Sequence, residues 1–142
     1  MTPKPINVLL VEDDELDVMN VRRAFKKHDM EAHLWVAGDG IDALAQLRDG
    51  SLPKERLLIL LDLNMPRMNG IEFLQELRRD QKLHRTPVVV LTTSNDERDL
   101  VDAYDLNVAG YIIKPVTFEK FVAVVGTMND YWSLVEMPSN NA

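Results

Sequence analysis

The sequence has no cysteine among its 142 residues, which excludes disulfide bonds and thiolate metal sites. This absence fits a reducing compartment. No apolar run reaches the roughly 20 residues that a membrane-spanning helix needs, and the run at residues 6–11 is too short for the core of a signal peptide. We therefore expect a cytoplasmic protein without a membrane anchor.

Basic residues are in the minority, because 16 lysines and arginines stand against 23 aspartates and glutamates and give a net charge of −7. A nucleic-acid partner would need a basic face to neutralise its phosphates, so we expect none. The length suits one domain, and a hydrophobic content of 46% suffices for a packed core. We expect the domain to span residues 1–128, with residues 129–142 extending the last helix into a tail and no separate output domain.

Short apolar runs alternate with segments of helical spacing along the chain. The central runs are apolar at successive positions, which is typical of parallel strands covered on both faces. Strand and helix alternate five times, and this predicts an α/β domain with a parallel sheet and right-handed crossovers. The five predicted strands lie at residues 6–11, 33–37, 57–61, 88–91 and 111–113.

Two polar signals predict where the later helices begin. Ser94 and Glu97 have the spacing of a capping box, so we expect Ser94 to cap the fourth helix. Thr117 is expected to cap the fifth.

Polar side chains follow four of the predicted strands, and parallel strands bring their carboxyl ends to one edge of the sheet. Glu12-Asp13 follows the first strand, Asp62 the third, Thr92 the fourth and Lys114 the fifth. Taken singly, each residue is more often a helix cap or a solvated loop residue. Their coincidence at four strand ends favours a shared site of carboxylates, a hydroxyl and an ammonium.

The acidic cluster predicts a metal site. Two carboxylates ~4 Å apart repel by about 4 kcal/mol at an effective dielectric near 20, and Lys114 offsets only part of this. An all-oxygen site with few protein ligands suits Mg²⁺. Beside such a metal Asp62 can attack phosphorus, with Asp13 as a metal ligand and Glu12 acting through water. Thr92 and Lys114 would then hold the other phosphoryl oxygens.

The residues at the strand ends, taken together, resemble the receiver domain of two-component response regulators. The resemblance covers residues 6 to about 128 and implies a flavodoxin-like, doubly wound five-stranded parallel sheet of order 2-1-3-4-5, flanked by five helices. The matching segments are Val8-Leu-Leu-Val-Glu-Asp-Asp14, Leu61-Asp-Leu-Asn-Met-Pro66, Gly70, Val90-Leu-Thr92 and Tyr111-Ile-Ile-Lys-Pro115.

The resemblance also implies roles for single residues. Asp62 would accept a phosphoryl group from the phosphohistidine of a sensor histidine kinase. Mg²⁺ would be bound by Asp13, Asp62 and the backbone carbonyl of Asn64, and Thr92 and Lys114 would contact the phosphoryl oxygens. The Lys114–Pro115 bond is expected to be cis, and Gly70 is expected to serve the turn into the third helix.

Tyr111 has two interpretations. It is either a core aromatic whose hydroxyl reaches the surface, or a switch residue that turns inward when Thr92 moves toward the phosphoryl group. The resemblance favours the switch. Asn64 and Ser94 occupy positions that tune the phosphoryl lifetime in this family.

The last helix has more apolar residues than one buried face requires. Either it lies deeper than an average terminal helix, or it presents a protein–protein surface, for which a symmetric homodimer is the simplest assembly. Residues 104–108 and 131–132 also resemble small response regulators that pair with bacterial and cyanobacterial phytochromes. The candidate interface residues are Val124, Met128, Tyr131, Trp132, Leu134 and Val135.

Three other functions compete with a phosphorylation switch. A phosphatase of the haloacid dehalogenase type needs a second aspartate two residues after its nucleophile, where this chain has Asn64. A flavodoxin-like electron carrier needs phosphate donors where this chain has Glu12-Asp13. A degenerate receiver that serves only as a docking module would not need the full acidic set. We therefore expect a phosphoacceptor signalling protein, not an enzyme, although it would assist its own phosphorylation and dephosphorylation.

Overall fold

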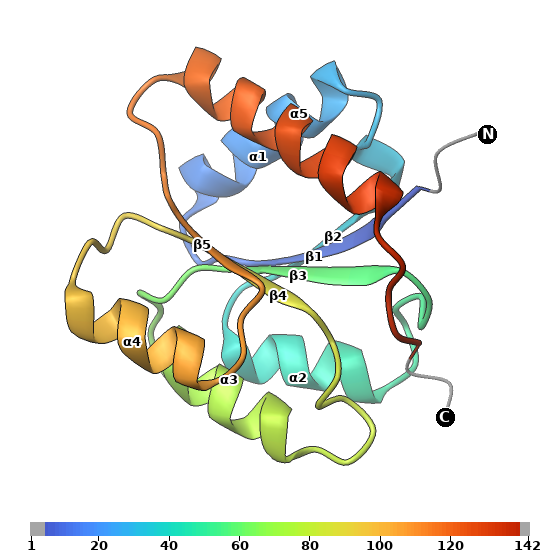
Figure 1. Cartoon of the computed structure of the whole chain (residues 1–142), viewed down its shortest axis with the longest axis vertical. Coiled ribbons are helices and arrows are strands. Elements are labelled where there is room, and N and C mark those ends of the chain that lie inside the picture. Colours follow the sequence, from blue (N-terminus) through green and yellow to red (C-terminus); the bar gives the residue numbers. More distant parts are fainter. Residues whose placement is uncertain (1–4, 140–142) are drawn as a thin grey trace.

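A computed structural model describes residues 5–139 and has one five-stranded parallel sheet of order β2-β1-β3-β4-β5. This confirms the predicted α/β fold and strand order. Helices α1 and α5 cover one face of the sheet, and α2, α3 and α4 cover the other (Figure 1). The strands are β1 (Asn7–Val11), β2 (Leu34–Ala37), β3 (Leu57–Leu61), β4 (Val88–Thr92) and β5 (Gly110–Ile113).

Each of the first four strands is followed by a helix that returns the chain to the start of the next strand, and α5 follows β5. A short 3₁₀ turn also precedes β2. Across residues 5–139, none of the helices is long and apolar enough to cross a membrane. The helices are α1 (Glu15–Lys27), η1 (Glu31–His33), α2 (Gly40–Arg48), α3 (Gly70–Arg79), α4 (Glu97–Asp105) and α5 (Phe118–Leu134).

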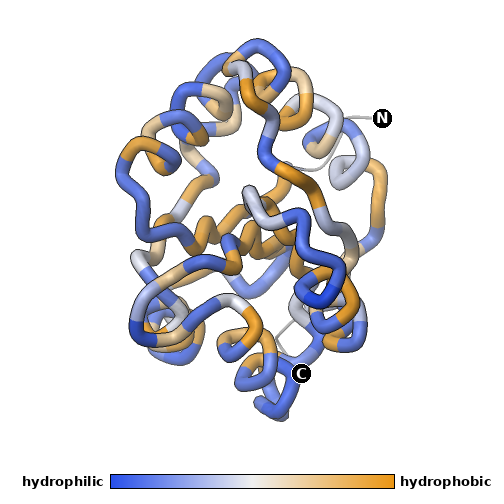
Figure 2. The backbone as a smooth tube through the Cα atoms, turned by 90° about the vertical axis from the view of Figure 1, so that its left-hand side faces the viewer, coloured by the Kyte–Doolittle hydropathy of each residue, from blue (hydrophilic) through white to orange (hydrophobic). Residues whose placement is uncertain are grey.

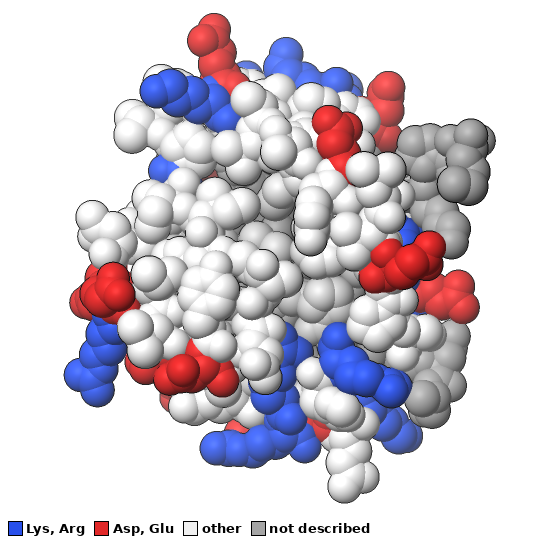
Figure 3. Space-filling view, viewed as in Figure 1, with Lys and Arg blue, Asp and Glu red and all other residues white. Residues whose placement is uncertain are grey.

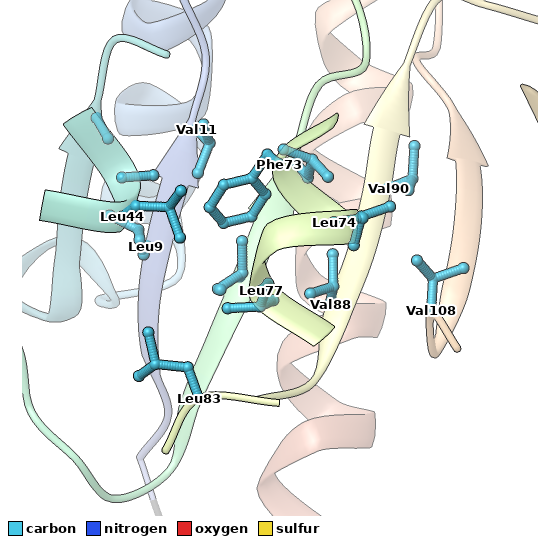
Figure 4. Packing of buried hydrophobic residues seen from close by; sticks show 14 of the residues in the cluster. Leu9, Val11, Leu44, Phe73, Leu74, Leu77, Leu83, Val88, Val90 and Val108 are labelled. Carbon is cyan, nitrogen blue, oxygen red and sulfur yellow. The ribbon is translucent and has the colours of Figure 1, made fainter. Parts of the chain in front are cut away.

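The middle of the sheet is apolar on both faces because helices cover both. Every residue of β3 and of β4 is buried, and the strands form the hydrophobic centre of the chain in Figure 2. On one face Phe73, Leu74 and Leu77 of α3 pack against the strands beside Leu44 of α2 (Figure 4). This two-sided burial explains why apolar residues succeed one another in the central strands.

The register of the strands sets the position of the candidate site. Val11 of β1 lies opposite Leu61 of β3, and Leu61 lies opposite Val90 of β4. Two backbone hydrogen bonds extend the ladder by one residue, from the Asp62 amide to the Val11 carbonyl and from the Glu12 amide to the Ala37 carbonyl, both at 3.0 Å. Glu12 and Asp62 are therefore held by the sheet itself.

Helix α4 begins two residues later than a cap at Ser94 would place it. Its N-cap is Asp96, whose carboxylate accepts a hydrogen bond from the Arg98 amide at 2.8 Å. Ser94 does not cap the helix, because its hydroxyl oxygen accepts from the Asp96 amide, which precedes the first turn, and the hydroxyl donates to the Asp99 carboxylate at 2.6 Å. The prediction for Ser94 was wrong, whereas Thr117 caps α5 as expected, accepting from the Lys120 amide.

Helix α5 lies deeper than the interface prediction required. Met128 and Trp132 are only 8% and 7% exposed and belong to the core on the α1 side of the sheet, so most of their surface is buried within the domain. Val135 packs against the same core. Tyr131 and Leu134 are exposed, and Val124 is half-buried. The helix thus has both a core face and an apolar outer face. The last residues of the predicted tail, 140–142, lie outside the described residues.

We predict that Gly70→Ala destabilises the fold and disturbs the turn after β3. A Cβ atom at position 70 would lie 2.7 Å from the Asp62 carbonyl oxygen and 2.7 Å from the Leu63 Cα, so backbone must move. Overpacking of this kind costs about 1–3 kcal/mol, and chemical denaturation measures it. Gly38→Ala is the control, because nothing lies within 4 Å of its Cβ. Equal stability of the two variants would contradict the prediction.

Candidate functional site

Three carboxylates meet at the carboxyl ends of β1 and β3. Each of Glu12, Asp13 and Asp62 offers an oxygen, and these oxygens lie within 4.8 Å of one another. Glu12 and Asp62 are buried, whereas Asp13 is exposed. The structure therefore brings together the three side chains that the sequence analysis assigned to a metal site, with one of them open to solvent.

Asp62 has an oxygen that the protein does not use. Among residues 5–139, Oδ1 of Asp62 is the buried side-chain oxygen or nitrogen atom without a hydrogen-bond partner. An unsatisfied buried acceptor costs about 1–3 kcal/mol, and more when it is charged. An orphaned carboxylate oxygen beside two further carboxylates fits a hard divalent cation, whose preferred ligands are oxygens.

Lys114 lies within the site and contacts two carboxylates there, and its contact with a phosphoryl oxygen stays a prediction. Its ammonium donates to the Glu12 carboxylate at 2.7 Å and to the Asp17 carboxylate at 2.9 Å. Burial alone would lower the pKa of Lys114, but these hydrogen bonds outweigh it and raise the pKa. The ammonium therefore stays charged and neutralises part of the acidic cluster, with the Asp62 charge adding to its stabilisation.

Asp17 is the site residue that sequence reasoning missed. It lies in the first turn of α1, one helical turn after Asp13. The signal in the sequence is this acid at the start of the first helix, and the structure joins it to the site through a hydrogen bond from Lys114. The signal was ambiguous, because acidic residues favour the first turn of any helix through its dipole.

Glu12 has the most perturbed carboxyl group of the site. Burial raises its pKa to about 7, and the Asp62 charge adds to this, although the hydrogen bond from Lys114 acts in the opposite direction. One lysine thus faces more carboxylates than it can neutralise. At neutral pH Glu12 is close to the midpoint of its titration.

Hydrogen bonds link Thr92 at the end of β4, Ser94 in the loop that follows, and Tyr111 of β5. Thr92 is fully buried, and its hydroxyl oxygen accepts a hydrogen bond from the Ser94 amide at 3.3 Å. The Tyr111 hydroxyl donates to the Ser94 carbonyl at 3.1 Å, and burial raises its pKa. Tyr111 thus fastens the loop that carries Ser94, and its role as a switch stays a prediction.

The loops on either side of the acidic cluster complete the site. Asn64 is exposed two residues after Asp62, and its carbonyl as a metal ligand stays a prediction. The peptide bond between Lys114 and Pro115 is trans, since residues 5–139 contain no cis bond, so the predicted cis bond is wrong. Trans is the ordinary state of such bonds by about 0.5–1 kcal/mol, and Lys114 reaches Glu12 from this backbone.

The sequence pattern of the response regulator receiver domain matches residues 8–126. The chain belongs to this family. The match covers strands β2 to β5, all of β1 except Asn7, and every strand-end residue discussed above. The strand-end motifs therefore predicted the family correctly, and this receiver domain is that of a response regulator.

Two related proteins align with this receiver domain over most of their lengths. The probable methanogenesis regulatory protein FilR2 of Methanothrix harundinacea is 39% identical over 133 residues, which cover 90% of this chain and 84% of FilR2. The response regulator Rcp1 of a Synechocystis species is 36% identical over 132 residues, which cover 90% of this chain and 89% of Rcp1.

Solved structures give the same family and a narrower group within it. The phosphorylated cyanobacterial phytochrome response regulator RcpA superposes with a TM-score of 0.85 at 35% identity, covering 96% of this chain and 100% of RcpA. The Mn²⁺-bound form of Rcp1 superposes with a TM-score of 0.82 at 35% identity, covering 95% of this chain and 100% of that structure. This receiver domain is thus similar to phytochrome-associated response regulators.

We predict that Asp62→Asn stabilises the protein when divalent cations are removed by EDTA. The change removes one charge from a buried group of carboxylates, and we expect a gain of about 1–3 kcal/mol in the free energy of unfolding. Chemical denaturation measures it. Asp130→Asn, an exposed acid on α5, is the control for the change in net charge. A loss of stability in Asp62→Asn would contradict strain within the acidic cluster.

We also predict that the metal-free protein loses stability as the pH rises from about 5 to 7. The pKa of Glu12 rises from its ordinary 4.5 to about 7 on folding, so in this window the native state holds a proton that the unfolded chain releases. The expected loss is on the order of 1–3 kcal/mol. Glu12→Gln should flatten this slope in urea denaturation at several pH values, and an equal slope in the variant would contradict the assignment to Glu12.

Proposed function

We propose that Asp62 is the phosphoacceptor of this response regulator and that the phosphorylated state is read out through protein–protein contacts. The observation that carries the proposal is the Asp62 carboxylate, which is buried at the end of the central strand and has an oxygen without a partner among residues 5–139. Ion-paired structural aspartates would have both oxygens satisfied. This oxygen is kept available for a cation or for phosphorus.

The proposed step transfers a phosphoryl group between two side chains. A carboxylate oxygen of Asp62 forms a bond to phosphorus as the bond between phosphorus and the imidazole nitrogen of the kinase phosphohistidine breaks, and the electron pair remains with the imidazole. Mg²⁺, held by Asp13, Asp62 and the Asn64 carbonyl, would neutralise charge on the phosphoryl oxygens. Glu12 would act on the metal through water.

Lys114 and Thr92 would stabilise the phosphoryl group on the other side. The Lys114 ammonium would leave Glu12 and Asp17, to which it donates in the present structure, and would donate to a phosphoryl oxygen instead. Thr92 ends β4 and has a hydroxyl that can donate to another oxygen. Movement of Thr92 would make room for Tyr111, which is the proposed switch.

The residues of the site favour a protein that accepts and retains a phosphoryl group over the competing functions. Asn64 cannot transfer the proton that a phosphatase of the dehalogenase type requires at its position. A docking module would have no need for a buried group of like charges, whose repulsion costs stability. We therefore propose a signalling protein that retains its phosphoryl group, and not an enzyme that turns over substrates.

The proposed phosphoryl donor is a sensor histidine kinase, and phytochromes are the class that the similarity favours. RcpA is described as a phytochrome response regulator, and this chain is 35% identical to it. The expected compartment is the cytoplasm, where such kinases hold their phosphohistidines.

The protein–protein contact that we propose for reading out the phosphorylated state is a homodimer formed through β5 and α5. A groove of about 540 Å³ lies between them, and the exposed ring of Tyr131 stands at its edge. Figure 3 shows this face as a broad uncharged area with charged side chains at its rim. A two-fold axis would let each copy place Tyr131 on the groove of its partner. The groove is lined by Val89, Ile112, Val124, Met128, Tyr131 and Trp132, among others.

Phosphorylation at Asp62 can be tested by mass. We predict that the wild type, incubated with Mg²⁺ and acetyl phosphate, gains the mass of one phosphoryl group, whereas Asp62→Asn gains none. Excess EDTA should abolish the gain, and Asp130→Asn should keep it. A phosphorylated Asp62→Asn, or a wild type that stays unmodified with Mg²⁺, would rule out Asp62 as the acceptor.

The dimer has a separate test. We predict that the wild type sediments as a dimer at micromolar concentration and that Tyr131→Asp shifts it toward monomer, because a charge would then enter the apolar contact. Glu119→Gln, an exposed change in the first turn of α5, should have no effect. A wild type that is monomeric with and without acetyl phosphate would exclude this interface.

A further inference from the structure

The loop between β3 and α3 contains a turn whose backbone conformation is unfavourable for a residue other than glycine. It leaves Asp62, passes Asn64 and turns sharply at Arg67, where the Met68 amide donates to the Pro66 carbonyl at 2.7 Å. Arg67 has a φ of 63°, in the left-handed region. A two-residue hydrogen bond closed around a positive φ is the rarer and strained form of the γ-turn. Such backbone conformations cost about 1–3 kcal/mol unless the surroundings enforce them.

The buried carboxylate of Asp39 holds the backbone of Arg67 in this conformation. The Arg67 guanidinium donates from Nε to Asp39 Oδ2 at 2.8 Å, and its Nη2 makes a further short contact with the same oxygen. Asp39 is 5% exposed and also caps α2, accepting from the Asp42 amide at 2.9 Å. Burial would raise the pKa of Asp39, but the hydrogen bonds from Asp42 and Arg67 lower it. The pair is therefore an ion pair at neutral pH.

A second contact fastens the same loop to the same helix. Met68 packs so closely on Gly40, the first residue of α2, that a Cβ there would lie 2.8 Å from its Cγ and Sδ. The ends of the loop are closed by a hydrogen bond of 3.1 Å from the Gly70 amide to the Leu63 carbonyl. The loop that carries Asn64 is thus held at its two ends by a backbone hydrogen bond and on its outer side by contacts with α2.

We propose that Arg67 and Asp39 form a latch that positions the β3–α3 loop for the metal site. The latch holds this loop in the conformation that places the Asn64 carbonyl for metal binding beside Asp62. Arg67 is thus a positioning residue, which acts through the loop and does not touch the metal. The inference rests on the proposed Mg²⁺ site, because only a bound cation requires the carbonyl to be placed accurately.

The charge of Arg67 makes the proposal easy to distinguish from a simple electrostatic effect. Arg67→Ala removes a positive charge near a cation site, which by Coulomb attraction alone would tighten cation binding. A latch predicts the opposite sign, since the freed loop would spend less time in the binding conformation. We expect the dissociation constant to rise about 3- to 10-fold, below the roughly 10- to 100-fold typical of residues that directly orient metal ligands, because Arg67 acts through the loop.

The experiment measures Mn²⁺ binding directly, by the electron paramagnetic resonance signal of free Mn²⁺, with no phosphoryl donor present. Arg67→Ala should bind Mn²⁺ more weakly than the wild type, and Arg67→Lys, which keeps one charged donor, should recover part of the loss. In the Asp39→Asn background, Arg67→Ala should have no further effect. Arg79→Ala is the control, because Arg79 forms an exposed pair with Glu76 on α3, away from the loop.

The possible results separate the latch from the site it serves. Unchanged or tighter binding in Arg67→Ala overturns the latch, provided that Asp62→Asn weakens binding and so confirms the site. If Asp62→Asn binds like the wild type, the metal site itself is wrong and the latch falls with it. Lower thermal stability of Arg67→Ala with an unchanged dissociation constant would make the pair purely structural, which also overturns the proposal.

Discussion

The main electrostatic constraint on the structure is the repulsion among carboxylates at the carboxyl edge of the sheet. Glu12 and Asp62 are buried there beside Asp13, and a single ammonium, that of Lys114, lies among them. The sheet can hold these charges because two-sided packing of apolar strands fixes the backbone at their ends. A bound cation would offset this repulsion. The same cluster contains Glu12, whose pKa is raised mainly by burial, and the unused oxygen of Asp62.

Much of this could be predicted from the sequence, because the informative features are local. Successive apolar residues, as in 57–61 and 88–91, mark central parallel strands. In such a sheet, topology alone brings the ends of neighbouring strands together. Glu12, Asp62 and Thr92 could therefore be placed at one edge without any knowledge of their contacts. The family followed from the same residues.

The remaining features depend on contacts that no local pattern specifies. Arg67 and Asp39 are 28 residues apart and meet only because their loops lie side by side in the fold. Asp17 resembles an ordinary first-turn acid until Lys114 is placed beside it. Trp132 has the same helical spacing whether its ring enters the core or an interface, and only packing decides that it is buried. Sequence period identifies apolar faces, but it does not say what covers them.

The central claim is that the Asp62 carboxylate is the group that accepts phosphorus. Borohydride reduces an aspartyl phosphate to homoserine, so reduction of the protein after incubation with Mg²⁺ and acetyl phosphate, followed by peptide mass spectrometry, locates the modified side chain. The account predicts homoserine at position 62 and unmodified aspartate at position 13. Homoserine at another position, or at none after full reduction, would contradict it.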